Sequence, residues 1–197
     1  MLFTGKGDNG TTKTFGCDQR ISKSSGIAEA LGSMDEINSF LGLVKVKAIS
    51  SEVVFTLESQ ELKLGETIDR IQQDLFIVQA ELAGADKTIS PEKVKWLEDI
   101  INGIEKMLPP IKTFFVSGGT ELASLCDISR TIARRAERRV VGVMDEFRAT
   151  QGELSTDKPP VGPSTLAYLN RLSSVLYAFA RASNHVAGIK EESPKYD

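Results

Sequence analysis

A stretch of glycine, threonine and lysine near the start of the chain has the composition of a phosphate-binding loop. Residues 4–13 read TGKGDNGTTK and contain a match to G-x-G-x-x-G at residues 5–10. A dinucleotide-binding turn with that pattern needs a preceding strand and a helix that opens from its last glycine. Residues 1–4 are too few for a buried strand, and residues 11–25 have no helical stripe of apolar side chains. The Walker A spacing is also missing from the sequence, so neither motif explains this segment.

Two interpretations of residues 4–13 remain. The segment is either a mobile N-terminal tail or an anion-binding nest, in which consecutive backbone N–H groups wrap an oxyanion. Its glycines permit the backbone shape of a nest, and its polar side chains add donors and positive charge. These side chains are Thr4, Lys6, Thr11, Thr12 and Lys13.

A second candidate site is an arginine-rich segment, SRTIARRAERRVV at residues 129–141. Arg130, Arg134 and Arg138 recur every four residues, so they line one face of a predicted helix. Like charges at this spacing repel by a few tenths of a kcal/mol per pair, and Glu137 offsets part of that repulsion. The row is either a solvated basic face or a place where an anion, or acidic residues of another helix, meets the arginines.

Two polar side chains lie beside apolar stripes of predicted helices. Asp35 is either an exposed carboxylate or a partner of Arg130 or Arg134, because a carboxylate at the edge of a core needs a counter-charge. Asn170 lies among leucines in YLNRLSSVLYAFAR, residues 168–181. It is either a satisfied core amide or a group that reads the hydrogen-bonding edges of a ligand.

The segment FFVSGGT, residues 114–120, places two aromatic rings directly before a glycine pair and a predicted helix start. Phe114 and Phe115 are either a core plug or an aromatic wall beside a site. In the second interpretation, an anion would face the N-terminus of the helix that follows.

The composition limits the class of protein. The chain has 197 residues, of which 41% are hydrophobic and 26% charged, as expected for one ordinary globular domain. A net charge of −3 provides no global basic field, and no aromatic residues are interleaved with the arginines, so we expect no nucleic-acid partner. Cys17 and Cys126 form neither a C-x-x-C motif nor a disulfide framework, which indicates a cytoplasmic protein. His185 is the single histidine, so a histidine-based metal site is not expected, and no apolar run is long enough to cross a membrane.

Helices must position these residues. Apolar stripes with a 3.6-residue period, and the turn residues between them, predict helices over residues 28–47, 62–83, 91–107, 121–147 and 164–188. We expect Ser90 and Ser164 to cap the third and fifth helices. No convincing strand is visible. The sequence therefore predicts an all-α protein, a five-helix antiparallel bundle in a single domain, 1–197. Residues 1–25 would be an irregular N-terminal loop, 26–188 the bundle and 189–197 a flexible tail.

Four segments together resemble the PduO-type ATP:cob(I)alamin adenosyltransferases, also called ATP:corrinoid adenosyltransferases. In chain order they are residues 4–12, ALGSMDEIN at 30–38, RTIARRAERRVV at 130–141 and YLNRLSSVLYAFAR at 168–181. The likeness extends from residue 3 to about residue 188. It implies a five-helix bundle that assembles as a homotrimer with ATP sites between subunits. It also implies transfer of the 5′-deoxyadenosyl group of ATP, which carries Mg²⁺, to the cobalt of cob(I)alamin, with release of triphosphate.

The resemblance implies roles for individual residues. Asp35 and Arg130 match an intersubunit ion pair beside the corrin, and Phe114 matches a phenylalanine whose ring displaces the lower axial ligand of cobalt. With Arg134, these three are the implied catalytic residues. The implied ATP-binding residues are Thr4, Gly5, Lys6, Gly7, Thr11, Thr12, Lys13, Lys23, Arg134, Arg135, Glu137, Arg138 and Asn170.

The chain departs from the family pattern at four places. The loop reads Thr-Gly-Lys-Gly-Asp where many members have Thr-Arg/Lys-Thr-Gly-Asp. Ser117 replaces a common proline, Asp127 stands where many members carry histidine, and Ser174 replaces a frequent aspartate. None of these changes removes a residue that is implied to bind phosphate or to act in catalysis.

The implied reaction fits the residues, because cob(I)alamin is itself a strong nucleophile and requires no catalytic triad from the protein. A reductase and an adenosylcobalamin-dependent enzyme are possible partners. The alternative is a non-enzymatic bundle that binds ATP or a corrinoid as a carrier or sensor. Both interpretations predict nucleotide binding, so turnover distinguishes them.

Overall fold

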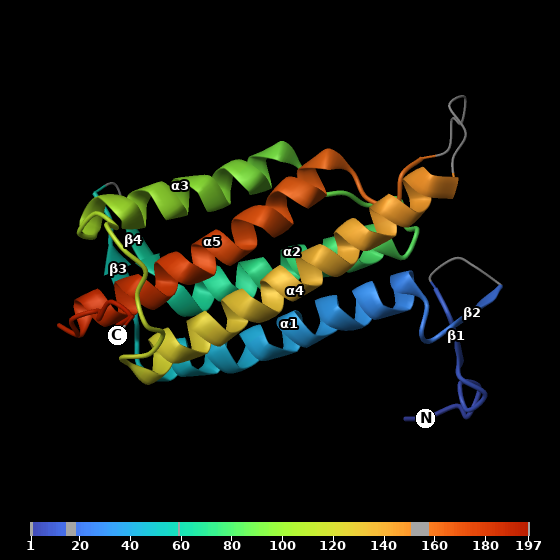
Figure 1. Ribbon diagram of the computed structural model, residues 1–197, viewed down its shortest axis with the longest axis horizontal. Coiled ribbons are helices and arrows are strands. Elements are labelled where there is room, and N and C mark those ends of the chain that lie inside the picture. Colours follow the sequence, from blue (N-terminus) through green and yellow to red (C-terminus); the bar gives the residue numbers. More distant parts are fainter. Residues whose placement is uncertain (1, 15–18, 59, 151–157, 197) are drawn as a thin grey trace.

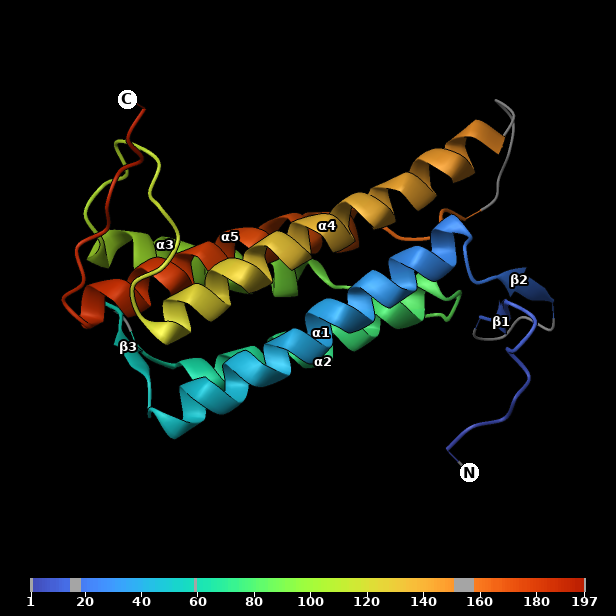
Figure 2. The same ribbon diagram turned by 60° about the horizontal axis from the view of Figure 1, so that its bottom comes forward.

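The computed structural model describes residues 2–14, 19–58, 60–150 and 158–196. Within these ranges five α-helices follow one another: α1 (Gly26–Ser50), α2 (Leu64–Leu82), α3 (Pro91–Met107), α4 (Glu121–Thr150) and α5 (Pro163–Val186). Successive helices run in opposite directions (Figures 1 and 2). The central helix α4 packs against α1 and α5, while α2 packs against α1 and α3 against α5. The predicted five-helix antiparallel bundle is confirmed, with helix bounds close to those expected.

The core is built from the apolar stripes that predicted the helices. On α1 the fully buried side chains recur at intervals of three and four residues: Ala30, Met34, Ile37, Leu41 and Val44. The small residues Ala133 and Ala136 of α4 are also buried. Because α4 turns these alanines toward the core, the arginines between them are placed on its outer and flanking faces.

Two short hairpins correct the prediction that the chain contains no strands. In the N-terminal segment, β1 (Thr11–Lys13) pairs antiparallel with β2 (Arg20–Ser22). Between α1 and α2, β3 (Val54–Thr56) pairs antiparallel with β4 (Glu61–Lys63). Strands of three residues are too short to display a period-2 pattern, so the sequence gives no usable signal for them. The expectation that residues 1–25 are wholly irregular was therefore wrong.

The start of α5 also differs from expectation. Its N-cap is Gly162 rather than Ser164, and Pro163 occupies the first turn. The buried carboxylate of Glu81, on α2, accepts hydrogen bonds from the backbone N–H of Gly162 at 3.0 Å and from the hydroxyl of Thr165. A side chain from another helix thus anchors the N-cap residue and the first turn of α5, although no side chain caps the backbone N–H groups of that turn.

The first residues of the C-terminal tail contact the bundle, and the flexibility expected for residues 189–197 stays a prediction. Arg181 Nε donates to a carboxylate oxygen of Glu191 at 2.9 Å, and the backbone N–H of Val116 donates to the carbonyl of Glu192 at 2.8 Å. The tail and the connection from α3 to α4 lie at one end of the bundle, whereas β1 and β2 lie at the other (Figures 1 and 2). Helix α4 separates these ends by about 45 Å, at 1.5 Å per residue.

A buried amide fixes the point at which α4 begins. Asn184, on α5, accepts a hydrogen bond from the backbone N–H of Thr120 at 2.9 Å and donates one to the carbonyl of Gly118 at 2.8 Å. Gly119 has a φ of +103°, and a Cβ there would lie 2.3 Å from Asn184 Oδ1. Asn184 therefore fixes the backbone of Gly118 and Gly119. These two residues lie at the end of the connection from α3 to α4, which carries Phe114 and Phe115.

We expect Gly119→Ala to lower the free energy of unfolding by more than about 1–2 kcal/mol, the cost of left-handed backbone for an L-residue. The added methyl group would also displace the Asn184 amide. Gly118→Ala is the matched control, because its φ is +134° but nothing lies within 4 Å of its Cβ position. Denaturant unfolding of both variants measures the difference, and equal losses would contradict the role of Asn184.

Candidate functional site

The arginine-rich segment of α4 has two faces with different partners. Arg135 pairs with Glu36 of α1, and Arg139 Nε lies 3.5 Å from a carboxylate oxygen of Glu29, also on α1. On the other face, Arg134 and Arg138 are exposed, and no acidic residue within the described part of the chain pairs with either. These two cations are therefore available to an anion from outside the chain.

Arg134 and Arg138 border a hollow of about 460 Å³ between α4 and α5. We call it the arginine pocket, and it is lined by Arg134, Glu137, Arg138, Val141, Gly142, Asp145 and Asn170. Asn170 Nδ2 donates to Glu137 Oε1 at 2.9 Å, so the amide is tied to the arginine segment. Asn170 is exposed, which excludes the interpretation as a core amide.

A second hollow, of about 580 Å³, lies between α4, α5 and the connection that precedes α4. We call it the aromatic pocket, and its walls include Phe114, Phe115, Ser117, Asp127, Arg130, Arg134, Ser174, Tyr177 and Arg181. Phe114 is 80% exposed, so it is not a core plug. Arg134 lines both pockets. Three of the departures from the family pattern, Ser117, Asp127 and Ser174, lie in this pocket.

Arg130 is held inside the aromatic pocket by its own helix. Its Nε donates to Asp127 Oδ1 at 3.2 Å, and its guanidinium carbon lies 5.7 Å from the centre of the Tyr177 ring. Of the two interpretations of Asp35, the structure fits the exposed carboxylate and not a pairing with Arg130 or Arg134 of the same chain, because no described residue pairs with it. A pairing of Asp35 with Arg130 of another subunit stays a prediction.

Two side chains beside this pocket, the Cys126 thiol and the Tyr177 phenol, stay protonated near neutral pH. Burial, followed by the neighbouring charge of Asp127, raises the pKa of the Cys126 thiol to about 12. Burial is also the largest cause that raises the pKa of Tyr177. A thiolate or phenolate nucleophile is therefore not available here near neutral pH, and the pocket is suited to holding and polarising ligands.

The N-terminal loop has a defined shape that depends on Arg20, a residue the sequence reasoning missed. Arg20 Nε donates to Thr11 Oγ1 at 2.6 Å, and its Nη2 donates to the carbonyl oxygens of Thr11 and Lys6. Gly5 has a φ of +66°, in the region that favours glycine. The Arg20 guanidinium thus joins the two ends of the loop, a long-range role that residue spacing could not reveal.

Lys23 lies against this loop. Its backbone N–H donates to the carbonyl of Gly10 at 2.9 Å. A Cβ at Gly7 would lie 2.9 Å from Lys23 Nζ, so the absence of a side chain at Gly7 makes room for the ammonium group. Thr4, Lys6, Lys13 and Lys23 are exposed, while Thr11 and Thr12 are half-buried in or beside β1.

One chain does not bring the loop and the two pockets together. No hydrogen bond or ion pair among the described residues joins residues 4–12 to α4. The described residues also contain no group of three or more histidine, cysteine, aspartate or glutamate side chains able to hold a metal ion. No helix in the described ranges is long and apolar enough to cross a membrane.

Known proteins share this sequence and architecture. Residues 2–183 match the family model described as cobalamin adenosyltransferase. The chain is 37% identical to the corrinoid adenosyltransferase PduO of Citrobacter freundii, over 94% of this chain and 50% of that protein. It is 36% identical to the corrinoid adenosyltransferase of Bacillus subtilis, over 95% of this chain and 89% of that protein. The chain spans about half the length of the PduO proteins that it matches.

A solved structure has the same fold. It is a variant of the PduO-type ATP:corrinoid adenosyltransferase from Lactobacillus reuteri, complexed with cobalamin and ATP. It matches with a TM-score of 0.80 at 29% identity and covers 99% of both chains. The resemblance seen in the four sequence segments is confirmed, and the chain belongs to the cobalamin adenosyltransferase family.

Proposed function

We propose that this chain transfers the 5′-deoxyadenosyl group of ATP to the cobalt of cob(I)alamin. The observation that carries the proposal is the position of Arg134, whose side chain borders both the arginine pocket and the aromatic pocket. A triphosphate in the first pocket and a corrin in the second would place the two substrates on either side of one guanidinium. Membership of the cobalamin adenosyltransferase family supports this choice of substrates.

The reaction breaks one bond and forms one bond. The electron pair of Co(I) attacks C5′ of ATP and forms the Co–C bond, and the electron pair of the broken C5′–O bond leaves with triphosphate. Arg134 and Arg138 are the groups of this chain that would stabilise the charge gathering on the leaving group. Mg²⁺ enters with ATP as part of the substrate, bound to phosphate oxygens.

Phe114 is the proposed neighbour of the lower face of the cobalt. Its ring is exposed in the wall of the aromatic pocket, where an apolar group would exclude water or another axial donor. A cobalt without a lower ligand is easier to reduce to Co(I). Asp127 and Arg130 lie on the α4 side of the same pocket and would contact the periphery of the corrin.

We propose a homotrimer in which each ATP site is shared by two subunits. In a single chain the N-terminal loop and the connection from α3 to α4, which carries Phe114, lie at opposite ends of the bundle (Figures 1 and 2). Asp35 is exposed on α1, free to meet Arg130 of a neighbour. Exposed apolar side chains recur along α1 at Leu43, Val46 and Ile49, which supports a protein contact on that helix.

The cytoplasm is the proposed compartment, because Cys126 is a free thiol. The proposed chemistry also requires two kinds of partner outside the chain. One is a reductase that supplies Co(I), and the other is an enzyme that uses the adenosylated product.

The wild-type protein, supplied with ATP, Mg²⁺ and chemically reduced cob(I)alamin, is expected to form adenosylcobalamin much faster than an enzyme-free mixture. Absorbance spectra of the corrinoid follow the formation of the Co–C bond.

We expect Arg134→Ala to weaken ATP binding about 10- to 150-fold, because it removes a hydrogen bond to a charged group worth about 1.5–3 kcal/mol.

Arg139→Ala is the matched control for this test. It removes an arginine from the same helix, but Arg139 faces Glu29 in an exposed pair of small energetic value. Rates at the enzyme-free level in the wild-type protein would instead support a carrier or sensor. Equal effects of the two substitutions would mean that Arg134 has no special role.

Phe114→Ala is expected to slow turnover strongly when cob(II)alamin must be reduced in place, and much less when cob(I)alamin is supplied. Because the ring is exposed, the substitution should change the free energy of unfolding by less than about 0.5 kcal/mol and leave ATP affinity unchanged. Phe115→Ala is the comparison, since that ring is half-buried beneath Arg181, at 5.1 Å. Equal losses in both assays for Phe114→Ala would remove Phe114 from the corrin site.

A further inference from the structure

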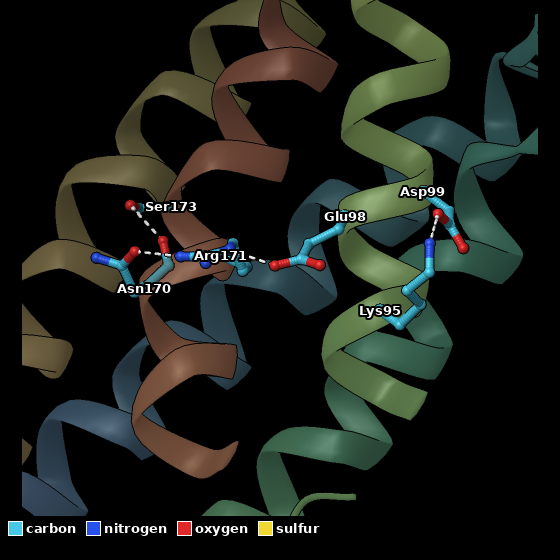
Figure 3. A network of polar contacts seen from close by, with 6 residues as sticks. All are labelled: Lys95, Glu98, Asp99, Asn170, Arg171 and Ser173. Atoms are coloured by element: carbon cyan, nitrogen blue, oxygen red, sulfur yellow. Dashed lines mark hydrogen bonds and ion pairs between the residues drawn. The ribbon is translucent and has the colours of Figure 1, made fainter. Parts of the chain in front are cut away.

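A chain of polar contacts connects Asn170, which lines the arginine pocket, to helix α3 (Figure 3). Arg171, on α5, donates from Nε to Glu98 Oε1 of α3 at 2.9 Å. It also donates from Nη1 to Oδ1 of its neighbour Asn170 at 2.6 Å. Asn170 Nδ2 in turn donates to Glu137 of α4 at 2.9 Å, so the contacts cross three helices.

The direction of these contacts fixes the orientation of the Asn170 amide. A guanidinium can only donate hydrogen bonds, so the group that faces Arg171 must be the amide oxygen. An ionised carboxylate can only accept, so the group that faces Glu137 must be the amide nitrogen. Rotating the amide by 180° would place like groups against each other on both sides.

The side chain of Arg171 is held in place by Glu98, a residue outside the arginine pocket. Adjacent residues on a helix point in different directions and do not normally face each other. Arg171 nevertheless contacts Asn170 through Nη1 of its guanidinium, while Nε of the same group is bound to Glu98 (Figure 3). Arg171 does not line the arginine pocket, whereas Asn170 does.

We infer that Arg171 is a positioning residue for nucleotide binding, which presets the donor and acceptor that Asn170 offers to ATP. The inference rests on the proposed function, because it takes ATP as the ligand of the arginine pocket. An Asn amide has two donor hydrogens and two acceptor lone pairs. Arg171 and Glu137 use one of each, which leaves one donor and one acceptor in a fixed order for the ligand.

The test measures MgATP binding by calorimetry and steady-state kinetics on the whole 197-residue chain. Arg171→Met should weaken ATP binding about 2- to 12-fold, the range that one hydrogen bond covers. The KM for ATP should rise while kcat at saturating ATP changes little. Arg171→Lys keeps the positive charge near Glu98 but lacks the planar guanidinium that contacts two partners at once. It should therefore show the same loss of ATP affinity in a folded protein.

Two further comparisons separate positioning from general stability. Glu98→Gln should weaken ATP binding in the same direction. Asp99→Asn should not, although it removes the exposed pair with Lys95 from the same helix (Figure 3). In an Asn170→Ala background, Arg171→Met should have no further effect on ATP affinity, because the group that it positions is gone.

Unchanged ATP affinity in both Arg171 variants would overturn the inference. The inference would also be overturned if Arg171→Met lowered ATP affinity equally with Asn170 present and in the Asn170→Ala background. Arg171 would then act without Asn170. If the wild-type protein bound no ATP, the proposed function would fail and this inference with it. A wild-type protein that binds and turns over ATP normally, beside unaffected Arg171 variants, would reject the positioning role alone.

Discussion

Arg134 and Arg138 carry two like charges on one face of α4, and within the described residues no carboxylate pairs with either. Helix α4 cannot rotate to relieve this arrangement. Its buried alanines, Ala133 and Ala136, face the core, and Arg135 is paired with Glu36 of α1. The helical period therefore holds Arg134 and Arg138 over the hollow between α4 and α5. An anion that enters this hollow offsets a repulsion that the fold itself imposes.

The remaining features of the site serve to position ligands. The Cys126 thiol and the Tyr177 phenol are protonated, since the pKa of Cys126 is raised to about 12 and that of Tyr177 is also raised. Arg130 is oriented by Asp127, and Asn170 is oriented from two sides by Glu137 and Arg171. Such preorganised groups suit a reaction in which one substrate supplies the nucleophile and the other the leaving group.

Features that repeat along one helix could be predicted from the sequence. The five helices follow from apolar periodicity, and the arginine row follows from spacing within α4. Contacts between distant segments could not be predicted in this way. Arg20 bonds to Thr11 and Lys6, and Arg181 bonds to Glu191, with no periodic pattern that relates the partners.

The spacing of residues in the sequence also left open which side chains are exposed to solvent. Two aromatic residues before a glycine pair fit a core plug as well as a pocket wall, and only the fold shows Phe114 exposed. Asp35 likewise fits an internal or an external partner until α1 and α4 are placed. The family resemblance, in contrast, rests on four segments in order, and it implies the fold without any of these contacts.

We propose that the loop of one subunit and the arginine row of the next form one catalytic site. Mixed oligomers test it directly, with Arg134→Ala subunits co-expressed with subunits that carry Lys13→Ala and Lys23→Ala. Each variant alone should be nearly inactive. In random mixed trimers about a quarter of the sites would combine an intact loop with an intact arginine row, so adenosyl transfer should recover to about that fraction of the wild-type rate. Mixed oligomers no more active than either variant alone would show that the site is not shared between subunits.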